Sequence, residues 1–472
     1  MIKTLSVILA AVQVFLFTCF KTFNNVQSIG VNKYEAYQTF ESFGTSSAWW
    51  AQTIDDDETA KEIARLLYDD ETGLGLDVFR YNVGAGEKDN PDSRIGDVNR
   101  RAESFYVYNP ETGEYEYDFT RDANARRMLD YAIEYGATQV VLFANSPHYS
   151  FTESGHASGS FKNLTCNLPE ENYDDYVDYM LTIADWFVEQ GYPVTAISPV
   201  NEPQWTWGGA WVGQEGCHYE PHQVAELFEL FALEMQKRNS PYILSGPESG
   251  QLTEDYYRYI DEYFANPVIN DYCGYLSVHS YWIDNRIDVK SAFGQKMLEQ
   301  YPDKKVEMTE WCELPQHIDP KTIESGMYMA NIIAQDLKYL NAVSWQSWTA
   351  VNGDGLLDRK GEELITYNHY YAFMQFTKFI KPGMQRIQVL DSKEGSSQIE
   401  SVAFTDGKQT VIVLINNAQE DTKVDLFGLY KSMSLWQTDA DSDCEQVYSG
   451  RYDNDLTLPS QSITTVVLES LI

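Results

Sequence analysis

One pattern recurs along most of this chain: a short apolar segment, a loop, and then an amphipathic helix. The apolar segments are typical of buried strands, and they fall at 40–44, 76–83, 139–144, 195–200, 242–245, 275–279, 305–309 and 342–345. Between two of them, Tyr176, Met180, Ile183 and Phe187 recur at helical spacing on one face. Eight such units predict a closed (β/α)8 TIM barrel. A doubly wound open sheet is the alternative, but 83–86 lacks the third glycine of a dinucleotide-binding loop.

The pattern changes after Pro382-Gly383 to short alternating strands separated by turns. This change predicts a small all-β sandwich domain formed by 382–472, with 30–39 adding a strand to it. The barrel then occupies 40–381, and a chain of 472 residues is long enough for both domains.

Charge and aromatic content limit the class of partner. The formal net charge of −37 argues against nucleic acid and anionic membranes, because both would be repelled, and it favours a neutral substrate. The 33 Tyr and 11 Trp are typical of clefts that stack on sugar rings, although a Tyr-rich core is the alternative. The seven histidines are scattered, so we expect no metal and no cofactor.

The N-terminus has the pattern of an export signal. Lys3 precedes an apolar run from Leu5 to Phe20, which predicts a signal peptide or N-terminal anchor over 1–21. We therefore expect a secreted or cell-surface protein and a monomer, with the cleaved, lipid-anchored and uncleaved forms all left open. No later segment is apolar enough to span a bilayer. The five cysteines beyond the signal show no C-x-x-C spacing, and Cys166 with Cys217 is the pair most open to oxidation.

Two glutamates lie at the ends of predicted apolar strands. Glu202 lies at the end of the fourth strand and Glu310 at the end of the seventh. The carboxyl ends of barrel strands converge on one mouth, where chemistry takes place. Cleavage of a glycosidic bond needs such a pair, about 5 to 5.5 Å apart for retention or about 6.5 to 9.5 Å for inversion. A non-catalytic carbohydrate-binding protein and a metal-dependent hydrolase are the alternatives from other classes. The first would not need both glutamates, and the second would need histidine and aspartate clusters.

Four motifs in register carry a resemblance to a known family. They are Asn201-Glu202-Pro203, Thr309-Glu310-Trp311, the segment 40–50 and Ser277-Val278-His279-Ser280-Tyr281. Together they resemble glycoside hydrolase family 30, from about residue 38 to the C-terminus. The resemblance implies a retaining double displacement in which Glu202 is the acid/base and Glu310 the nucleophile.

The resemblance also implies a set of substrate-binding residues. Arg80 matches the family arginine near the nucleophile, Asn201 the donor to the sugar hydroxyl beside the anomeric carbon, and Tyr281 a partner of Glu310. His279 shapes the site, with a satisfied core histidine as the alternative. The remaining candidates are Asn145 and the tryptophans near strand ends: Trp49, Trp205, Trp211, Trp345 and Trp348. We expect at least two of these tryptophans to stack on sugars.

The segments 145–149 and 213–219 look most like the endo-β-1,6-galactanase group, so a neutral β-1,6-galactan is the first expectation. A glucuronoxylanase or other xylan-active enzyme and a β-1,6-glucanase are the alternatives within the family. The choice of sugar, and endo versus exo action, depends on loops that the motifs do not specify.

Overall fold

The structure is a computed structural model that describes residues 8, 11–19, 26–161, 164–209, 213–314, 318–351, 353, 355–361 and 363–471. The chain forms two compact units. One comprises Phe43–Cys312 and Trp345–Gly355, and the other Met1–Ser42, Glu313–Ser344 and Leu356–Ile472. The domain boundaries expected from the sequence stay a prediction.

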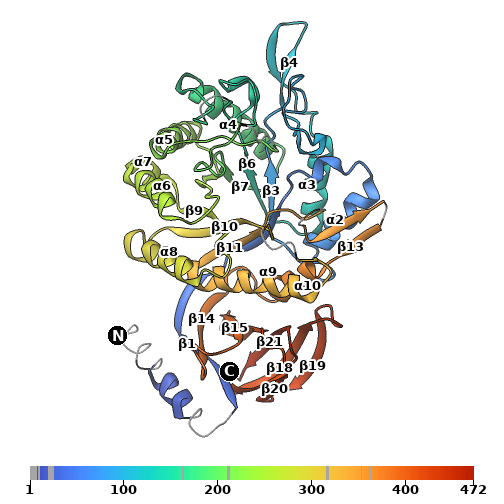
Figure 1. Ribbon diagram of the computed structural model, residues 1–472, viewed down its shortest axis with the longest axis vertical. Coiled ribbons are helices and arrows are strands. Elements are labelled where there is room, and N and C mark those ends of the chain that lie inside the picture. The colour runs from blue at the N-terminus through green and yellow to red at the C-terminus, as the bar shows by residue number, and fades with distance from the viewer. Residues whose placement is uncertain are drawn as a thin grey trace. The chain divides into compact units, whose positions relative to one another are not determined.

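Eight strands form the barrel sheet, in the order β8-β7-β6-β3-β2-β11-β10-β9 (Figure 1). Their bounds are β2 Ser42–Ser46, β3 Val78–Asn82, β6 Gln139–Phe143, β7 Val194–Ser198, β8 Ile243–Leu244, β9 Tyr275–His279, β10 Lys305–Trp311 and β11 Ala342–Ser347. A parallel bridge between Ser249 and Val278 brings the segment after β8 against β9, so the two ends of the sheet nearly close. The predicted barrel is confirmed, and each predicted strand overlaps an observed one.

The barrel strands are buried on both faces, as parallel strands covered by helices must be. All five residues of β3 and all six of β11 are buried, and in β3 the two polar side chains, Arg80 and Asn82, belong to the candidate site. Helices of this unit are α2 Asp57–Tyr68, α3 Ala123–Tyr135, α4 Tyr173–Glu189, α5 Pro221–Arg238, α6 Glu254–Ala265, α7 Pro267–Tyr272 and α8 Ile287–Gln300. On α4 the four residues predicted to share a face are all buried.

Helix α5 shows how local sequence sets these boundaries. Pro221 occupies its first turn, where the missing N–H costs nothing, and the Gln223 side chain accepts a hydrogen bond from the Glu220 amide at 2.9 Å. The helix ends where Asn239 adopts a left-handed conformation. Short elements of this unit are the 3-10 turns η1 Ala51–Thr53, η2 Val98–Arg100, η3 Tyr149–Phe151 and η4 Glu170–Asn172, and the hairpin of β4 Tyr106–Asn109 and β5 Glu114–Tyr117.

The second unit contains a nine-stranded sheet in the order β19-β18-β21-β16-β15-β14-β1-β17-β20. Its strands are β1 Gln27–Thr39, β14 Gln385–Asp391, β15 Ile399–Thr405, β16 Gln409–Asn416, β17 Thr422–Phe427, β18 Tyr430–Thr438, β19 Glu445–Arg451, β20 Asp455–Leu458 and β21 Ser462–Ser470. One apolar cluster contains side chains from strands near both ends of this order, among them Leu456 of β20 and Met433 of β18. Contact between distant strands of this kind is typical of a sandwich. The predicted strand near residues 30–39 is confirmed, because β1 lies between β14 and β17.

The same unit includes α9 Ile323–Gln335, the π-helical turn η5 Asp336–Leu340, the hairpin of β12 Leu357–Lys360 and β13 Glu363–Thr366, and α10 Asn368–Thr377. Helix α10 packs against β18 and β21. Within the described ranges, no helix is both long and apolar enough to cross a membrane. Parts of the predicted signal segment lie outside the described residues, and its role stays a prediction.

The cysteines are unlinked in the structure. In the pair singled out from the sequence, Cys166 Sγ donates to the Leu168 carbonyl at 3.3 Å and Cys217 Sγ donates to the His218 carbonyl at 3.6 Å.

Candidate active site

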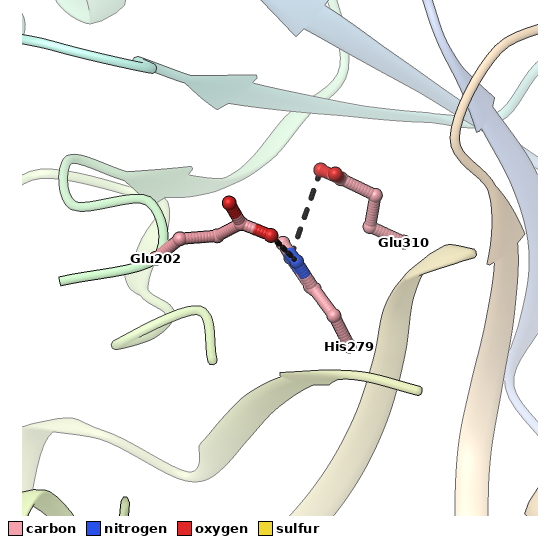
Figure 2. Close-up of side chains that lie close together, drawn as sticks. All are labelled: Glu202, His279 and Glu310. Carbon is pink, nitrogen blue, oxygen red and sulfur yellow. Dashed lines mark hydrogen bonds and ion pairs between the residues drawn. The ribbon is translucent and has the colours of Figure 1, made fainter. Parts of the chain in front are cut away.

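The two glutamates singled out from the sequence meet at one point of the barrel, with His279 between them (Figure 2). Glu202 lies just beyond β7 and Glu310 near the end of β10. Both residues are buried, with 7% of Glu202 and 4% of Glu310 exposed. Glu202 has a φ of 46°, a left-handed conformation that side chains with a Cβ rarely adopt. Such strain is found most often at functional sites.

Glu310 is held by two donors. The Arg80 Nη1 donates to Glu310 Oε2 at 2.9 Å, and the Tyr281 hydroxyl donates to Oε1 at 3.1 Å. Arg80 has no exposed surface, and its guanidinium stacks on the Phe143 ring at 3.6 Å. The two predicted partners of Glu310 therefore contact it directly.

His279 connects three carboxylates. Its Nδ1 lies 3.1 Å from Glu202 Oε1 and its Nε2 lies 3.0 Å from Glu248 Oε2, while Glu310 Oε2 is 3.6 Å from Nε2. Burial acts to lower the pKa of His279, but these carboxylates outweigh it and raise the pKa to about 9. With a carboxylate at each nitrogen, the ring is an imidazolium that donates from both sides.

Glu248 is the functional residue that sequence reasoning missed. It lies four residues beyond β8 and is 1% exposed. The Ser198 hydroxyl donates to Glu248 Oε1 at 2.7 Å, Arg80 Nη2 is 3.1 Å from the same oxygen, and Thr309 donates to Oε2. Burial opposes ionisation, but Arg80, then His279 and Thr309, hold the pKa of Glu248 well below its usual range. Glu248 is thus a permanent anion that anchors both cations of the site.

The charges around Glu310 act in opposite directions. Arg80 and His279 supply two positive charges, and ionised Glu248 cancels one of them. Burial, together with Glu202 and Glu248, raises the pKa of Glu310 to about 7 against the lowering effect of His279 and Arg80. The pKa of this carboxyl therefore lies above its usual range although two cations are close to it.

Three amides form a row beside the carboxylates. Asn145 Nδ2 donates to Asn82 Oδ1 at 3.0 Å, and Asn201 Nδ2 donates to Asn145 Oδ1 at 3.2 Å. Asn201 also forms a parallel bridge with Glu248. Because each amide nitrogen carries two N–H groups, Asn201 keeps one donor for another acceptor. Asn82 was not predicted, although it follows Arg80 at the end of the same strand.

The predicted tryptophans fall into different surroundings. Trp49 and Trp348 are half-buried and meet edge to face at 5.3 Å. Trp205 is half-buried and meets the exposed Trp282 at 5.5 Å. Trp345 is fully buried, with its ring 6.1 Å from that of Trp311. Trp211 lies outside the described residues.

Within the described part of the chain, one set of side chains has the closeness of a metal site. Single ligand atoms of Glu202, His279 and Glu310 all lie within 4.8 Å of one another. These side chains are also those that hydrogen-bond to one another and to Arg80, so their contacts in the structure are those of an acid–base cluster.

The fold and this cluster define a barrel enzyme with paired carboxylates at the strand ends. Residues 26–358 match the model of O-glycosyl hydrolase family 30. The chain belongs to this family and is a glycoside hydrolase that acts on polysaccharides.

Three similar proteins illustrate this membership. An endo-beta-1,6-galactanase of Hypocrea rufa is 24% identical over 80% of this chain and 78% of its own length. A conserved exported protein from Bacteroides fragilis has a crystal structure with a TM-score of 0.85 at 24% identity, covering 93% of this chain and 100% of that one. The catalytic domain of xylanase C from Talaromyces cellulolyticus has a TM-score of 0.73 at 18% identity, covering 94% and 100%. The likeness to the two solved structures establishes the fold.

Proposed function

We propose that this protein is a retaining endo-β-1,6-galactanase. The observation that carries the mechanism is the closeness of the two carboxylates, since an oxygen of Glu202 and an oxygen of Glu310 lie within 4.8 Å of each other. Retaining glycosidases keep their carboxyl groups about 5 to 5.5 Å apart, whereas inverting enzymes need room for a water molecule between carboxylate and sugar.

The surroundings of the pair support unequal roles. Glu310 accepts hydrogen bonds from Arg80 and Tyr281, which favour its anion, so Glu310 is the nucleophile. Glu202 is then the acid, which protonates the oxygen of the leaving sugar while Glu310 attacks the anomeric carbon. In the second half, Glu202 takes a proton from water, and the hydroxide formed displaces Glu310 from the sugar.

Asn201 and Tyr281 assist the sugar that is attacked. The free N–H of Asn201 donates to the hydroxyl beside the anomeric carbon, an interaction that strengthens in the transition state. While Glu310 is covalently bound to the sugar, the Tyr281 hydroxyl stays beside its carboxyl group. There it stabilises the carboxylate that forms again when the bond to the sugar breaks.

Two features support galactan and internal cleavage. The Hypocrea rufa relative is described as an endo-beta-1,6-galactanase. Aromatic pairs lie on both sides of the carboxylates, Trp49 with Trp348 near Arg80 and Trp205 with Trp282 beyond Glu202, as binding of sugars on both sides of the cleaved bond requires.

The test is product profiling on β-1,6-galactan, glucuronoxylan and β-1,6-glucan, with NMR of the first anomer released. We expect galactan to be cleaved fastest, to oligosaccharides, with the β-anomer appearing first. Faster release from xylan or glucan would refute the substrate, monosaccharide as the first product would refute endo action, and an initial α-anomer would refute retention.

We also propose that the protein is exported, on the strength of the apolar run after Lys3. The similar Bacteroides fragilis protein is described as exported. Expression with and without residues 1–21, followed by fractionation of cells and medium, tests the proposal. Equal retention of both forms inside the cell would refute it.

A further inference from the structure

A pocket of about 290 Å3 lies beyond the ends of β2, β3 and β11, and β11 neighbours β10, which carries Glu310. Its lining comes from three segments: the loop after β2, the turn η2 after β3, and the segment after β11. Trp348 connects it to the reaction centre, because its ring is 5.9 Å from the guanidinium carbon of Arg80, which donates to Glu310.

The pocket combines an aromatic wall with polar groups. Trp49 and Trp348 form the wall, and the guanidinium carbon of Arg100 lies 5.1 Å from the centre of the Trp49 ring. Asp97 and Asn99 also line the pocket. A tryptophan face suits the apolar C–H face of a pyranose, while guanidinium, carboxylate and amide groups suit its hydroxyls.

The turn that carries these groups is fixed by its own hydrogen bonds. Asp97 Oδ1 accepts from the Asn99 amide at 3.0 Å, and Gln52 Nε2 donates to the Asn99 carbonyl at 2.6 Å. Asn124 in turn donates to the Gln52 carbonyl at 3.0 Å. A turn held in this way binds a sugar without the entropic cost of first ordering it.

Arg100 is available for a ligand. The chain has 71 acidic and 34 basic residues, and five of the arginines that the structure describes form ion pairs: Arg65, Arg80, Arg121, Arg238 and Arg286. Among the described residues, none forms an ion pair with Arg100, whose side chain is exposed and contacts the Trp49 ring. The guanidinium therefore has all of its donors free for hydroxyl oxygens, while the cation–π contact with Trp49 keeps it over the pocket.

We propose that this pocket is a subsite for a neutral pyranose on the glycone side of the cleaved bond, and that Asp97, Asn99 and Arg100 determine specificity there. The proposal rests on the proposed retaining mechanism. In that mechanism the nucleophile contacts the sugar whose anomeric carbon is attacked, so the Glu310 side of the mouth receives the glycone. Trp205 and Trp282 receive the leaving part of the chain.

The test compares Arg100→Ala and Trp49→Ala with wild type on β-1,6-linked galactooligosaccharides of two to five units, measuring kcat/KM for each length and the bond cleaved. Arg258→Ala is the matched control, because Arg258 is an exposed arginine on α6 away from the pocket lining. We expect kcat/KM for the longer chains to fall about five- to tenfold more than for the disaccharide. We also expect the cleavage position to move toward the non-reducing end, while the control follows wild type.

Each outcome decides the proposal. If both variants lose activity equally at every length, or neither loses any, the subsite is refuted while the glycosidase function stands. If wild type cleaves xylo- or β-1,6-glucooligosaccharides faster than the galactose series, the proposed substrate fails, and the same length comparison on the faster series still tests the subsite. A loss confined to chains that carry a uronic acid would refute a neutral ligand and assign Arg100 to a carboxylate.

Discussion

Two groups of buried carboxylates lie in the barrel unit, and they differ in the charges around them. In the catalytic cluster, Glu202, Glu248 and Glu310 face two buried cations, Arg80 and His279. Each carboxylate contacts at least one of these cations, so negative charge is stabilised there despite the burial. The acids of this group can ionise and react.

The second group is the pair Glu87 and Glu215, both fully buried. Glu87 accepts from the Ala157 amide at 2.6 Å and Glu215 from the Ala85 amide at 3.2 Å, and the Oε2 atom of each has no hydrogen-bond partner among the described residues. Burial, then the charge of Glu87, raises the pKa of Glu215 to about 8. The titratable groups near Glu87 are Arg94 and His156, which lies 3.9 Å away and whose pKa is lowered by burial.

The difference shows that burial alone does not make a glutamate catalytic. Glu215 connects the loop after β3 to its own loop, and Glu87 reaches the loop after β6, so this pair holds together loops that surround the mouth. The proton on Glu215 avoids a buried charge, whereas the carboxylates of the catalytic cluster lie beside two cations. The same Glu→Gln change should therefore act differently in the two groups.

The largest effect is expected for Glu310→Gln. An amide cannot attack the anomeric carbon, so kcat on galactan should fall by roughly 10⁴-fold or more. The thermal midpoint should drop, but less than for Glu248→Gln, because the single amide oxygen can accept from only one of Arg80 and Tyr281, while Arg80 keeps its ion pair with Glu248. Steady-state kinetics measure kcat and calorimetry measures the thermal midpoint, and Glu226→Gln on the exposed face of α5 is the control. Activity near the wild-type level would remove Glu310 from the mechanism.

Glu248→Gln is expected to affect both activity and stability. The change leaves Arg80 and His279 without their shared anion, and breaking a buried ion pair costs about 3 to 5 kcal/mol. We expect kcat/KM to fall about 100-fold and the thermal midpoint to drop, with the pKa of His279, followed by NMR, falling from about 9. Glu248→Asp keeps a carboxylate, so it should retain part of the activity and part of the stability. An unchanged His279 titration would contradict the anchoring role.

The barrel could be predicted because its strands are short, apolar and regularly spaced. In β9 the predicted and observed bounds coincide, and in β10 the strand runs two residues further, to Trp311. The loops were less predictable. The Gly/Ser-rich segment 154–160 has no apolar periodicity, yet its second half packs against Trp207 and Gly208, because Gly159 and Gly208 allow the two backbones to approach closely.

The site was predictable where a candidate residue lies within, or shortly after, a strand long enough to be recognised. Arg80 and Glu310 lie within β3 and β10, and Glu202 lies four residues beyond the five-residue β7. Glu248 also lies four residues beyond a strand, but β8 has only two residues. Nothing in the local pattern distinguishes such a glutamate from the 71 acidic residues of the chain. Its role depends on Ser198, Arg80 and His279, which come from three other strands.

The raised pKa of Glu310 gives the candidate site a distinct pH dependence. Burial, with Glu202 and Glu248, raises the pKa of Glu310 to about 7, and a protonated Glu310 cannot attack the anomeric carbon. We expect kcat/KM on galactan to fall about tenfold per pH unit as the pH falls below about 7. An aryl glycoside with a good leaving group needs the same nucleophile, so it should show the same acid-side loss. A kcat/KM that stays constant as the pH falls through this range would contradict the role of Glu310.

Glu215→Gln is expected to leave kcat almost unchanged and to alter the pH dependence of stability. The folded protein keeps Glu215 protonated up to a pKa of about 8, whereas the unfolded chain releases this proton near 4.5. The stability contributed by the protonated form is thus fully present below pH 4.5 and is lost as the pH rises through 8, by about 5 kcal/mol. Glutamine has no proton to lose, so the variant should exceed wild type in thermal midpoint at pH 8 and match it more closely at pH 5. Glu226→Gln should show no such pH-dependent difference from wild type in thermal midpoint. Parallel curves for Glu215→Gln and wild type would mean that Glu215 is ionised in the folded protein, and the contrast between the two carboxylate groups would then disappear.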